Sequence, residues 1–210
     1  MELRNKSLWD FTKELASDAP APGGGGVGAL LASQGAALIS MVCCLTMGKK
    51  KYAEYEDEIL EMDKRAKENS QKALIMVDED EENFLPLSKA YGLPKNTDEE
   101  RNNREEIMEK ALLVAMKTPQ DTLSMCIELI LDAKRLLIIG SKLVQSDVGV
   151  AAECILAAAK SSMWNMYINL KMLQDEKNKA ALLMDAEEKI AAVEIEYNHI
   201  IEDLNNRLAP

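Results

Sequence analysis

The sequence has few aromatic residues, a single histidine and too little basic charge to balance its acidic residues. Aromatic residues make up 4% of the 210 residues, whereas Ala, Leu and Met are abundant, and this composition favours helices over a β-sandwich. The net charge of −11 argues against nucleic-acid binding, which usually needs a broad basic surface, but a local basic cluster is compatible with an anionic small molecule. With 47% hydrophobic residues, the chain can build the core of one domain.

The cysteines lack the spacing of a metal site. Cys43, Cys44, Cys126 and Cys154 form no CxxC pair, and the only histidine, His199, is close to none of them in the sequence. We therefore expect no metal, and we expect buried free thiols in a reducing, cytoplasmic compartment. The N-terminal residues MELRNKSLWDF lack the apolar core of a signal peptide.

One uncharged segment is long enough to cross a membrane. Residues 26–48 carry no charge and are followed by three lysines, as the positive-inside rule would require. The segment contains Ser33, Gln34, Ser40 and Thr46, however, and the other predicted helices are amphipathic. We interpret it as the central helix of a helical bundle, which is also apolar on all sides, and we expect no membrane contact.

Hydrophobic periodicity predicts about six helices and no strand of useful length. Ser7 with Asp10 resembles a capping box at the first helix, and Thr97 precedes an acidic first turn. Pro86 is expected to kink or end the third helix, and Pro119 to interrupt or kink the fourth. The predicted helices begin at Ser7, near Gly26, after the lysines, at Thr97 and near Ser146, and an acidic, lysine-rich sixth helix completes the chain. The fold class is all-α, with residues 1–210 forming a single-domain antiparallel multi-helix bundle.

Two polar residues fall on the apolar stripe of the third predicted helix. Asn69 and Asp80 occupy positions at which the alternating three- and four-residue spacing calls for apolar side chains. A carboxylate on such a face must be paired, protonated or functional. The alternative is that Asp80 only caps a break before Pro86.

A second polar stripe runs along the fifth predicted helix. Asp147 and Asn165 are 18 residues apart, which is five turns, so they share a face, and Asn169 follows one turn later. Small residues lie between them. This pattern predicts either a ligand cavity or a close helix–helix contact with hydrogen-bonded asparagines. Alternatively, Asp147 is only an N-terminal residue favoured by the helix dipole.

Arg104 lies three residues before an apolar stripe position of the fourth predicted helix. It can point inward as a carboxylate partner or anion clamp, or it can be an ordinary surface arginine. The basic run Lys49, Lys50 and Lys51 is either a solvated helix end or a set of ammonium groups for an anionic substrate tail.

The run PGGGGVG at residues 22–28 is not a nucleotide-binding loop. It lacks the G-K-[ST] ending and no strand precedes it, so neither the phosphate loop nor the dinucleotide fingerprint applies. Glycines at a helix N-terminus expose backbone N–H groups and allow a ligand or another helix to approach closely.

Three blocks of the sequence resemble the cyclodeaminase/cyclohydrolase family in order and spacing. They are APAPGGGGVGALLASQGAALISMVCCLTMGKKKY, DEENFLPLSKAYGLPKNTDEERNNR and SDVGVAAECILAAAKSSMWNMYINL. The family includes the cyclodeaminase domain of formiminotransferase-cyclodeaminase and the stand-alone bacterial methenyltetrahydrofolate cyclohydrolase. The resemblance covers about residues 5–205. It implies an all-helical homodimer that acts on a tetrahydrofolate derivative and needs no cofactor beyond the folate substrate.

The sequence departs from the family pattern at two points. Family members often carry Ser where this chain has Gly26, and the usual Asn-Val pair appears as Asn165–Met166. No formiminotransferase domain precedes the matching blocks, so we expect the stand-alone activity, the hydrolysis of 5,10-methenyltetrahydrofolate to 10-formyltetrahydrofolate in one-carbon metabolism. The alternatives are release of ammonia from formiminotetrahydrofolate and a non-catalytic helical dimer.

The implied reaction needs a carboxylate near the cationic bridge, a base for water and a proton donor for the departing nitrogen. We predict that Asp147 orients or deprotonates the water, and that Asp80 is a second carboxylate, held by Arg104 or acting as proton shuttle. The glycines would form a wall for the flat pterin, the asparagines would hydrogen-bond it, and the lysines would meet its glutamate tail. The predicted substrate-binding residues are Gly23, Gly24, Gly25, Gly26, Lys49, Lys50, Lys51, Ser146, Asn165 and Asn169.

Overall fold

The computed structural model describes residues 2–208, and within them it contains α- and 3-10 helices but no strand. The all-α prediction is therefore confirmed. The α-helices are α1 (Leu8–Leu15), α2 (Gly24–Cys44), α3 (Glu56–Tyr91), α4 (Asp98–Ala115), α5 (Lys117–Ile139), α6 (Gln145–Leu170) and α7 (Glu176–Leu208), and the 3-10 helices are η1 (Leu3–Asn5), η2 (Lys50–Tyr55) and η3 (Lys142–Val144).

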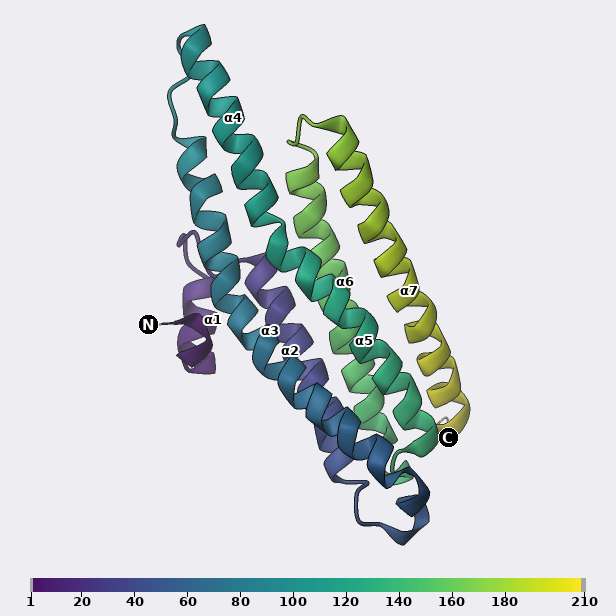
Figure 1. Ribbon diagram of the computed structural model, residues 1–210. Helices are drawn as coiled ribbons and strands as arrows, with labels where there is room; N and C mark the ends of the chain where they lie inside the picture. The colour runs from purple at the N-terminus through teal and green to yellow at the C-terminus, as the bar shows by residue number, and fades with distance from the viewer. Residues whose placement is uncertain (1, 209–210) are drawn as a thin grey trace.

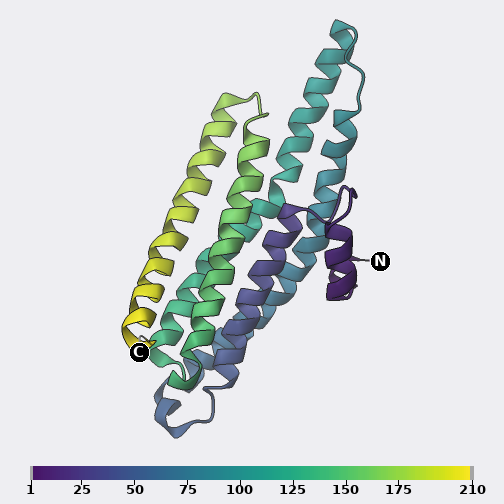
Figure 2. The same cartoon turned by 180° about the vertical axis from the view of Figure 1, so that it is seen from behind.

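The helices form a bundle in which α2 is central. Helices α3 and α5 lie on one face (Figure 1), and α2, α6 and α7 lie on the other (Figure 2). Helix α2 packs against α3, α5 and α6. It is long and apolar enough to cross a membrane, but more than half of its most apolar stretch is buried inside the bundle. This arrangement agrees with its interpretation as a core helix.

Small residues allow α2 and α6 to approach each other closely. A Cβ atom on Gly35 would lie 2.8 Å from Ile155 Cγ1, and one on Gly28 would lie 3.3 Å from Ser161 Cβ. A side chain at Gly35 would force Ile155 or the helix to shift, and one at Gly28 would make a tight contact, so glycine favours the observed close packing. The same contacts fix the register, because the beginning of α2 lies beside the end of α6.

The helix ends follow the predicted capping signals in part. Ser7 caps α1 by accepting the Asp10 N–H, and Thr97 with Glu100 forms a capping box at α4. Helix α3 does not end at Pro86. It continues to Tyr91, because Leu87 and Ala90 beyond the proline are buried in the core and offset the missing backbone hydrogen bond.

The fourth predicted helix is divided in two. The break falls at Met116, between α4 and α5, and Pro119 lies in the first turn of α5, where its missing N–H has no partner to lose. Helix α2 begins at Gly24 and ends at Cys44, whereas the prediction was residues 26–48. Gly23 is the N-cap in an extended conformation, and Gly48 turns the chain with a positive φ of 74°.

Candidate active site

A cavity of about 260 Å³ lies where the glycine run meets α3, α5 and the last turns of α6. Its size is below the range of about 300–1,000 Å³ typical of pockets that enclose a whole drug-sized ligand, so it holds only part of a folate-sized molecule. The lining residues are Pro20, Ala21, Gly23, Gly24, Gly25, Asp80, Glu81, Phe84, Tyr91, Ala115, Pro119, Asn165, Ile168 and Asn169.

Asp80 is the central polar group of this pocket. Its Oδ2 accepts a hydrogen bond of 2.8 Å from the backbone N–H of Gly26, in the first turn of α2, where helical N–H groups have no partner within the helix. Burial raises the pKa of Asp80 to about 6, and the Gly26 hydrogen bond opposes this rise. A carboxylate with this pKa can take up and release a proton near neutral pH.

Gly25 is needed for Asp80 to lie where it does. A Cβ atom at Gly25 would be 2.1 Å from Asp80 Oδ1, which is closer than any real contact. At Gly26 the nearest atoms to such a Cβ would be 3.7 Å away, and at Gly23 there is nothing within 4 Å. Of these glycines, Gly25 is therefore the one at which a side chain would displace Asp80.

Asn165 and Asn169 face the pocket from α6. The Nδ2 of Asn165 donates to the carbonyl of Ser161 (2.8 Å), and the Nδ2 of Asn169 donates to the carbonyl of Asn165 (3.0 Å). These bonds orient both amides, and within residues 2–208 their Oδ1 atoms accept no hydrogen bond. The pocket therefore presents a carboxylate and two amide oxygens, a set that suits a ligand with N–H donors and positive charge.

The pocket lining contains no lysine or arginine. Arg104 lies on α4 outside the lining, and its Nε is buried without a hydrogen-bond partner among the described residues. Within residues 2–208, the only hydrogen bond to Asp80 comes from Gly26, so the backbone holds Asp80 and Arg104 does not. Of the two predicted roles of Asp80, pairing with Arg104 is wrong, and proton shuttling stays a prediction. Asn69 lies apart, on the exposed side of α3, and donates to Glu128.

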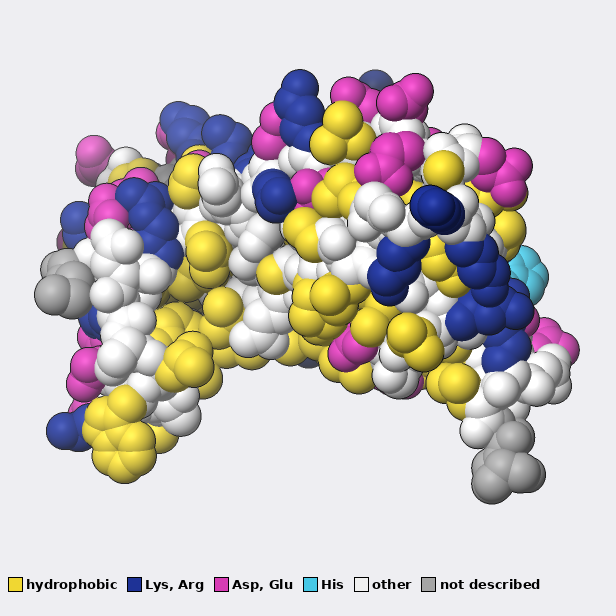
Figure 3. Space-filling model, turned by 90° about the horizontal axis from the view of Figure 1, so that it is seen from below, with side chains coloured by type: hydrophobic (Ala, Val, Ile, Leu, Met, Phe, Trp, Pro, Cys, Tyr) yellow, Lys and Arg dark blue, Asp and Glu magenta, His cyan; other side chains and the backbone are white. Residues whose placement is uncertain are grey.

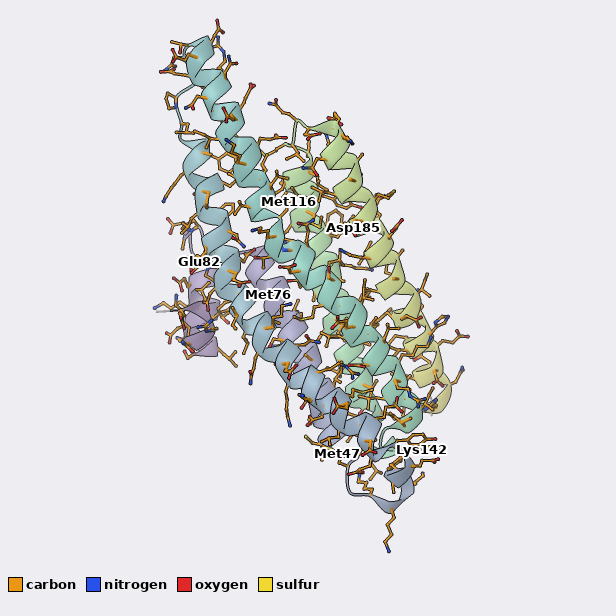
Figure 4. The ribbon with its side chains drawn as sticks, viewed as in Figure 1. Met47, Met76, Glu82, Met116, Lys142 and Asp185 are labelled. Carbon is orange, nitrogen blue, oxygen red and sulfur yellow. The ribbon has the colours of Figure 1, made fainter. Side chains whose placement is uncertain are left out.

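The other predicted residues lie at the opposite end of the bundle. Ser146 and Asp147 are in the first turn of α6, and the three lysines follow α2, where Lys49 Nζ donates to Ser141 Oγ (3.0 Å). The 21 residues of α2 separate this end from the pocket by about 30 Å. Figure 4 shows the separation, with Lys142 near one end of the molecule and Glu82 farther up α3.

The structure therefore brings Asp80, the glycine run and the two asparagines together, and it leaves Asp147, Ser146 and the lysines away from them within one chain. Sequence reasoning missed the apolar walls formed by Phe84, Tyr91 and Ile168. A signal for Phe84 was present, because it lies one turn after Asp80 on the same stripe.

Comparison with known proteins places this arrangement in a family. Residues 7–188 match the family model described as formiminotransferase-cyclodeaminase. The chain is 36% identical over 204 residues to the methenyltetrahydrofolate cyclohydrolase of Methylorubrum extorquens, covering 97% of this chain and 98% of that protein. It is 30% identical to the formimidoyltransferase-cyclodeaminase of Sus scrofa, where it covers 91% of this chain but only 37% of the longer protein.

A solved structure has the same fold. The crystal structure of formiminotetrahydrofolate cyclodeaminase from Thermotoga maritima superposes with a TM-score of 0.88 at 29% identity, covering 99% of this chain and all of that one. The resemblance drawn from the three sequence blocks is thus confirmed. The chain belongs to the formiminotransferase-cyclodeaminase family.

Proposed function

We propose that this protein is a methenyltetrahydrofolate cyclohydrolase, which hydrolyses 5,10-methenyltetrahydrofolate to 10-formyltetrahydrofolate. The observation that carries the proposal is Asp80, a partly buried carboxylate with a pKa of about 6 inside an acceptor-lined pocket. The higher identity to the Methylorubrum cyclohydrolase, 36% against 30% for the Sus scrofa formimidoyltransferase-cyclodeaminase and 29% for the Thermotoga cyclodeaminase, supports this choice.

The substrate has a cationic amidinium bridge, and ionised Asp80 attracts it. Asp80 takes one proton from the attacking water as the oxygen bonds to the bridging carbon. The tetrahedral intermediate then opens: the second water proton leaves to solvent, the carbon–oxygen double bond forms, and Asp80 returns its proton to the departing ring nitrogen. The Oδ1 atoms of Asn165 and Asn169 accept hydrogen bonds from the pterin N–H groups, and the bare backbone at Gly24 and Gly25 lets the flat ring approach.

A direct comparison of two substrates tests this assignment. We expect the purified protein to hydrolyse methenyltetrahydrofolate, followed by the loss of its absorbance, at least ~100 times faster than it releases ammonia from formiminotetrahydrofolate, a difference of about 2.7 kcal/mol in barrier. The D80N protein, purified in the same way, is the control for contaminating enzymes. Faster release of ammonia would favour the cyclodeaminase alternative, and no turnover of either substrate would favour the non-catalytic alternative.

We also propose that the protein is a cytoplasmic homodimer. Supporting this is an apolar surface on the exposed sides of α2 and α6, here called the dimer face. Figure 3 shows hydrophobic side chains along this hollowed side of the molecule, between α1 and the end of α7. The dimer face consists of Val27, Leu30, Leu31, Gln34, Ala37, Leu38, Met41 and Leu45 on α2 and of Val150, Cys154, Ala157, Ser161, Trp164 and Ile168 on α6. A surface of this extent is typical of a subunit interface.

The dimer is tested by a matched pair of charge substitutions. Light scattering after size exclusion should give a mass of about 47 kDa, twice the 23.3 kDa of one chain. V150E should shift the protein to monomer, because it places a charge in the apolar contact. Val150 is 51% exposed, and Leu131 on the opposite face is 49% exposed, so L131E is the control and should stay dimeric. The proposal fails if both variants give the same mass.

A further inference from the structure

The floor of the pocket is formed by the junction between α4 and α5. Ala115 is the last residue of α4, Pro119 lies in the first turn of α5, and both line the cavity. Both residues are buried, whereas Tyr91 and Ile168, which also line the cavity, are 46% and 59% exposed. The cavity therefore opens to solvent at Tyr91 and Ile168, and it ends at Ala115 and Pro119.

The junction leaves the backbone carbonyl of Ala115 without its helical partner. Regular helical bonding stops with the N–H of Met116, which donates to the Leu112 carbonyl (3.1 Å). It resumes with the N–H of Gln120, which donates to the Met116 carbonyl (3.1 Å). Within residues 2–208, no backbone N–H donates to the carbonyl of Ala115. The cause lies in the sequence, because the residue four positions ahead is a proline and has no N–H to give.

This free carbonyl lies on the side of the helix that faces the cavity. A helical carbonyl points along the axis toward the residue four positions ahead, and for Ala115 that residue, Pro119, also lines the cavity. Ala115 is only 7% exposed, so bulk water reaches its carbonyl poorly. A buried carbonyl without a partner costs free energy, and a ligand that brings a donor to it recovers this cost.

A contact from α3 holds the junction in place. The Nδ2 of Asn83 donates to the Oγ1 of Thr118 (3.0 Å), and Thr118 is buried at the start of α5. This bond links the junction to the helix that carries Asp80, the central polar group of the pocket. The carbonyl of Ala115 and the carboxylate of Asp80 therefore belong to one fixed arrangement, which a ligand meets already formed.

We infer that the Ala115 carbonyl accepts a hydrogen bond from the 2-amino group of the pterin. The class of ligand rests on the proposed function. The cavity holds only part of a folate, so the glutamate tail leaves through the mouth. In a tetrahydrofolate, the 2-amino group and the carbon that bears the tail lie at opposite ends of the bicyclic pterin. A pterin whose tail points outward therefore directs its amino group to the floor of the pocket, where the free acceptor is.

A single N–H at position 119 tests the acceptor. Pro119→Ala supplies an N–H that can donate to the Ala115 carbonyl and so compete with the ligand. Pro119→lactic acid, introduced by nonsense suppression, is the same change with an ester oxygen in place of that N–H. Both variants lose the proline ring, so the ring does not enter the comparison. Calorimetry should show that Pro119→Ala binds 5-formyltetrahydrofolate at least ~5-fold more weakly than its ester counterpart. Equal dissociation constants would overturn the inference.

Pro86→Ala is the matched control in another helix. It also gives an N–H to a proline position, but the carbonyl four residues back is that of Glu82, and neither residue lines the pocket. We expect this variant to bind 5-formyltetrahydrofolate as the wild type does. A loss of affinity as large as that of Pro119→Ala would mean that restored helical bonding in general explains the effect, and it would overturn the inference.

Removal of the amino group from the ligand tests the same contact from the other side. The wild type should bind the 2-desamino-2-methyl analogue of 5-formyltetrahydrofolate at least ~10-fold more weakly than the parent compound. In Pro119→Ala this preference should be at least ~5-fold smaller, because the acceptor is already occupied. An unchanged preference would overturn the inference.

These measurements of binding are independent of turnover, so they separate the inference from the proposed function. If the wild type binds 5-formyltetrahydrofolate but hydrolyses no methenyltetrahydrofolate, the proposed function fails, and a difference between the amide and ester variants at position 119 still supports the acceptor. If turnover is present and these two variants bind equally, the proposed function stands and the acceptor is overturned. A wild type that binds no folate overturns both.

Discussion

Replacement of Asp80 by asparagine is expected to lower kcat by ~1,000-fold or more while the fold stays intact. The amide cannot take a proton from water or return it to the leaving nitrogen. Its oxygen can still accept the Gly26 N–H, so the first turn of α2 keeps its partner. The rate is measured by the loss of methenyl absorbance at saturating substrate.

The control for Asp80 is its neighbour Glu79. E79Q makes the same change of charge one residue away, on an exposed part of α3 outside the pocket lining, and should leave kcat unchanged. A fall of less than tenfold in D80N would remove Asp80 from the role of base, because a lost general base costs at least ~100-fold.

The D80N substitution should also change the melting temperature by an amount that depends on pH. Burial raises the pKa of Asp80 to about 6, so between the ordinary range of a carboxyl group and pH 6 the native state binds more protons than the unfolded state. This contribution to the free energy of unfolding is fully present at low pH and is lost as the pH rises through 6. D80N should therefore melt at a higher temperature than the wild type at pH 8, and at the same temperature near pH 3. In the wild type, kcat/KM should rise through pH 6 as Asp80 ionises.

Gly25→Ala is expected to give the second-largest loss of rate, after the loss of the carboxylate itself. The new Cβ would lie 2.1 Å from Asp80 Oδ1, so the carboxylate must move by an ångström or more, and a displacement of that size can cost ~100-fold in rate. The helix should not suffer, since alanine in a helix is about 1 kcal/mol more favourable than glycine. Loss of activity without loss of melting temperature is the expected combination.

Gly26→Ala provides the comparison for Gly25→Ala. The substitution is chemically identical and adjacent, but its Cβ would be 3.7 Å from Val77 Cγ1 and 3.8 Å from Asp80 Oδ2, which are ordinary contacts. We expect a loss of only a few-fold. Equal losses in the two variants would mean that the glycine run matters for the backbone alone and not for the position of Asp80.

The sequence was most informative where the determinants are local. Capping at Ser7 and Thr97 and the apolar stripes depend on residues a turn or two apart, so they could be predicted. Pro86 was harder to interpret, because the burial of Leu87 and Ala90 that keeps α3 intact depends on contacts with other helices. Position on a stripe singled out Asp80, yet its partner is a backbone N–H 54 residues away, which no periodicity can indicate.

Helical face arithmetic has a similar limit. The spacing of 18 residues puts Asp147 and Asn165 at the same angle around the helix axis. Both lie on the side of α6 that is not buried in the core. Five turns also separate them by about 27 Å along the axis, so one chain cannot use both in the same small pocket. An angle around a helix carries no information on how far apart two residues lie along its axis.

The four glycines from Gly23 to Gly26 look equivalent in the sequence, but they differ in whether evolution can replace them with another residue. Gly25 tolerates no side chain while Asp80 stays in place, whereas Gly26 leaves room for a small one. A hydroxyl group introduced there could donate to Asp80 Oδ2, favour the ionised form and move the working range of the enzyme toward acid. Gly25 is therefore fixed by the position of Asp80, whereas a substitution at Gly26 can change the pH range in which the enzyme works.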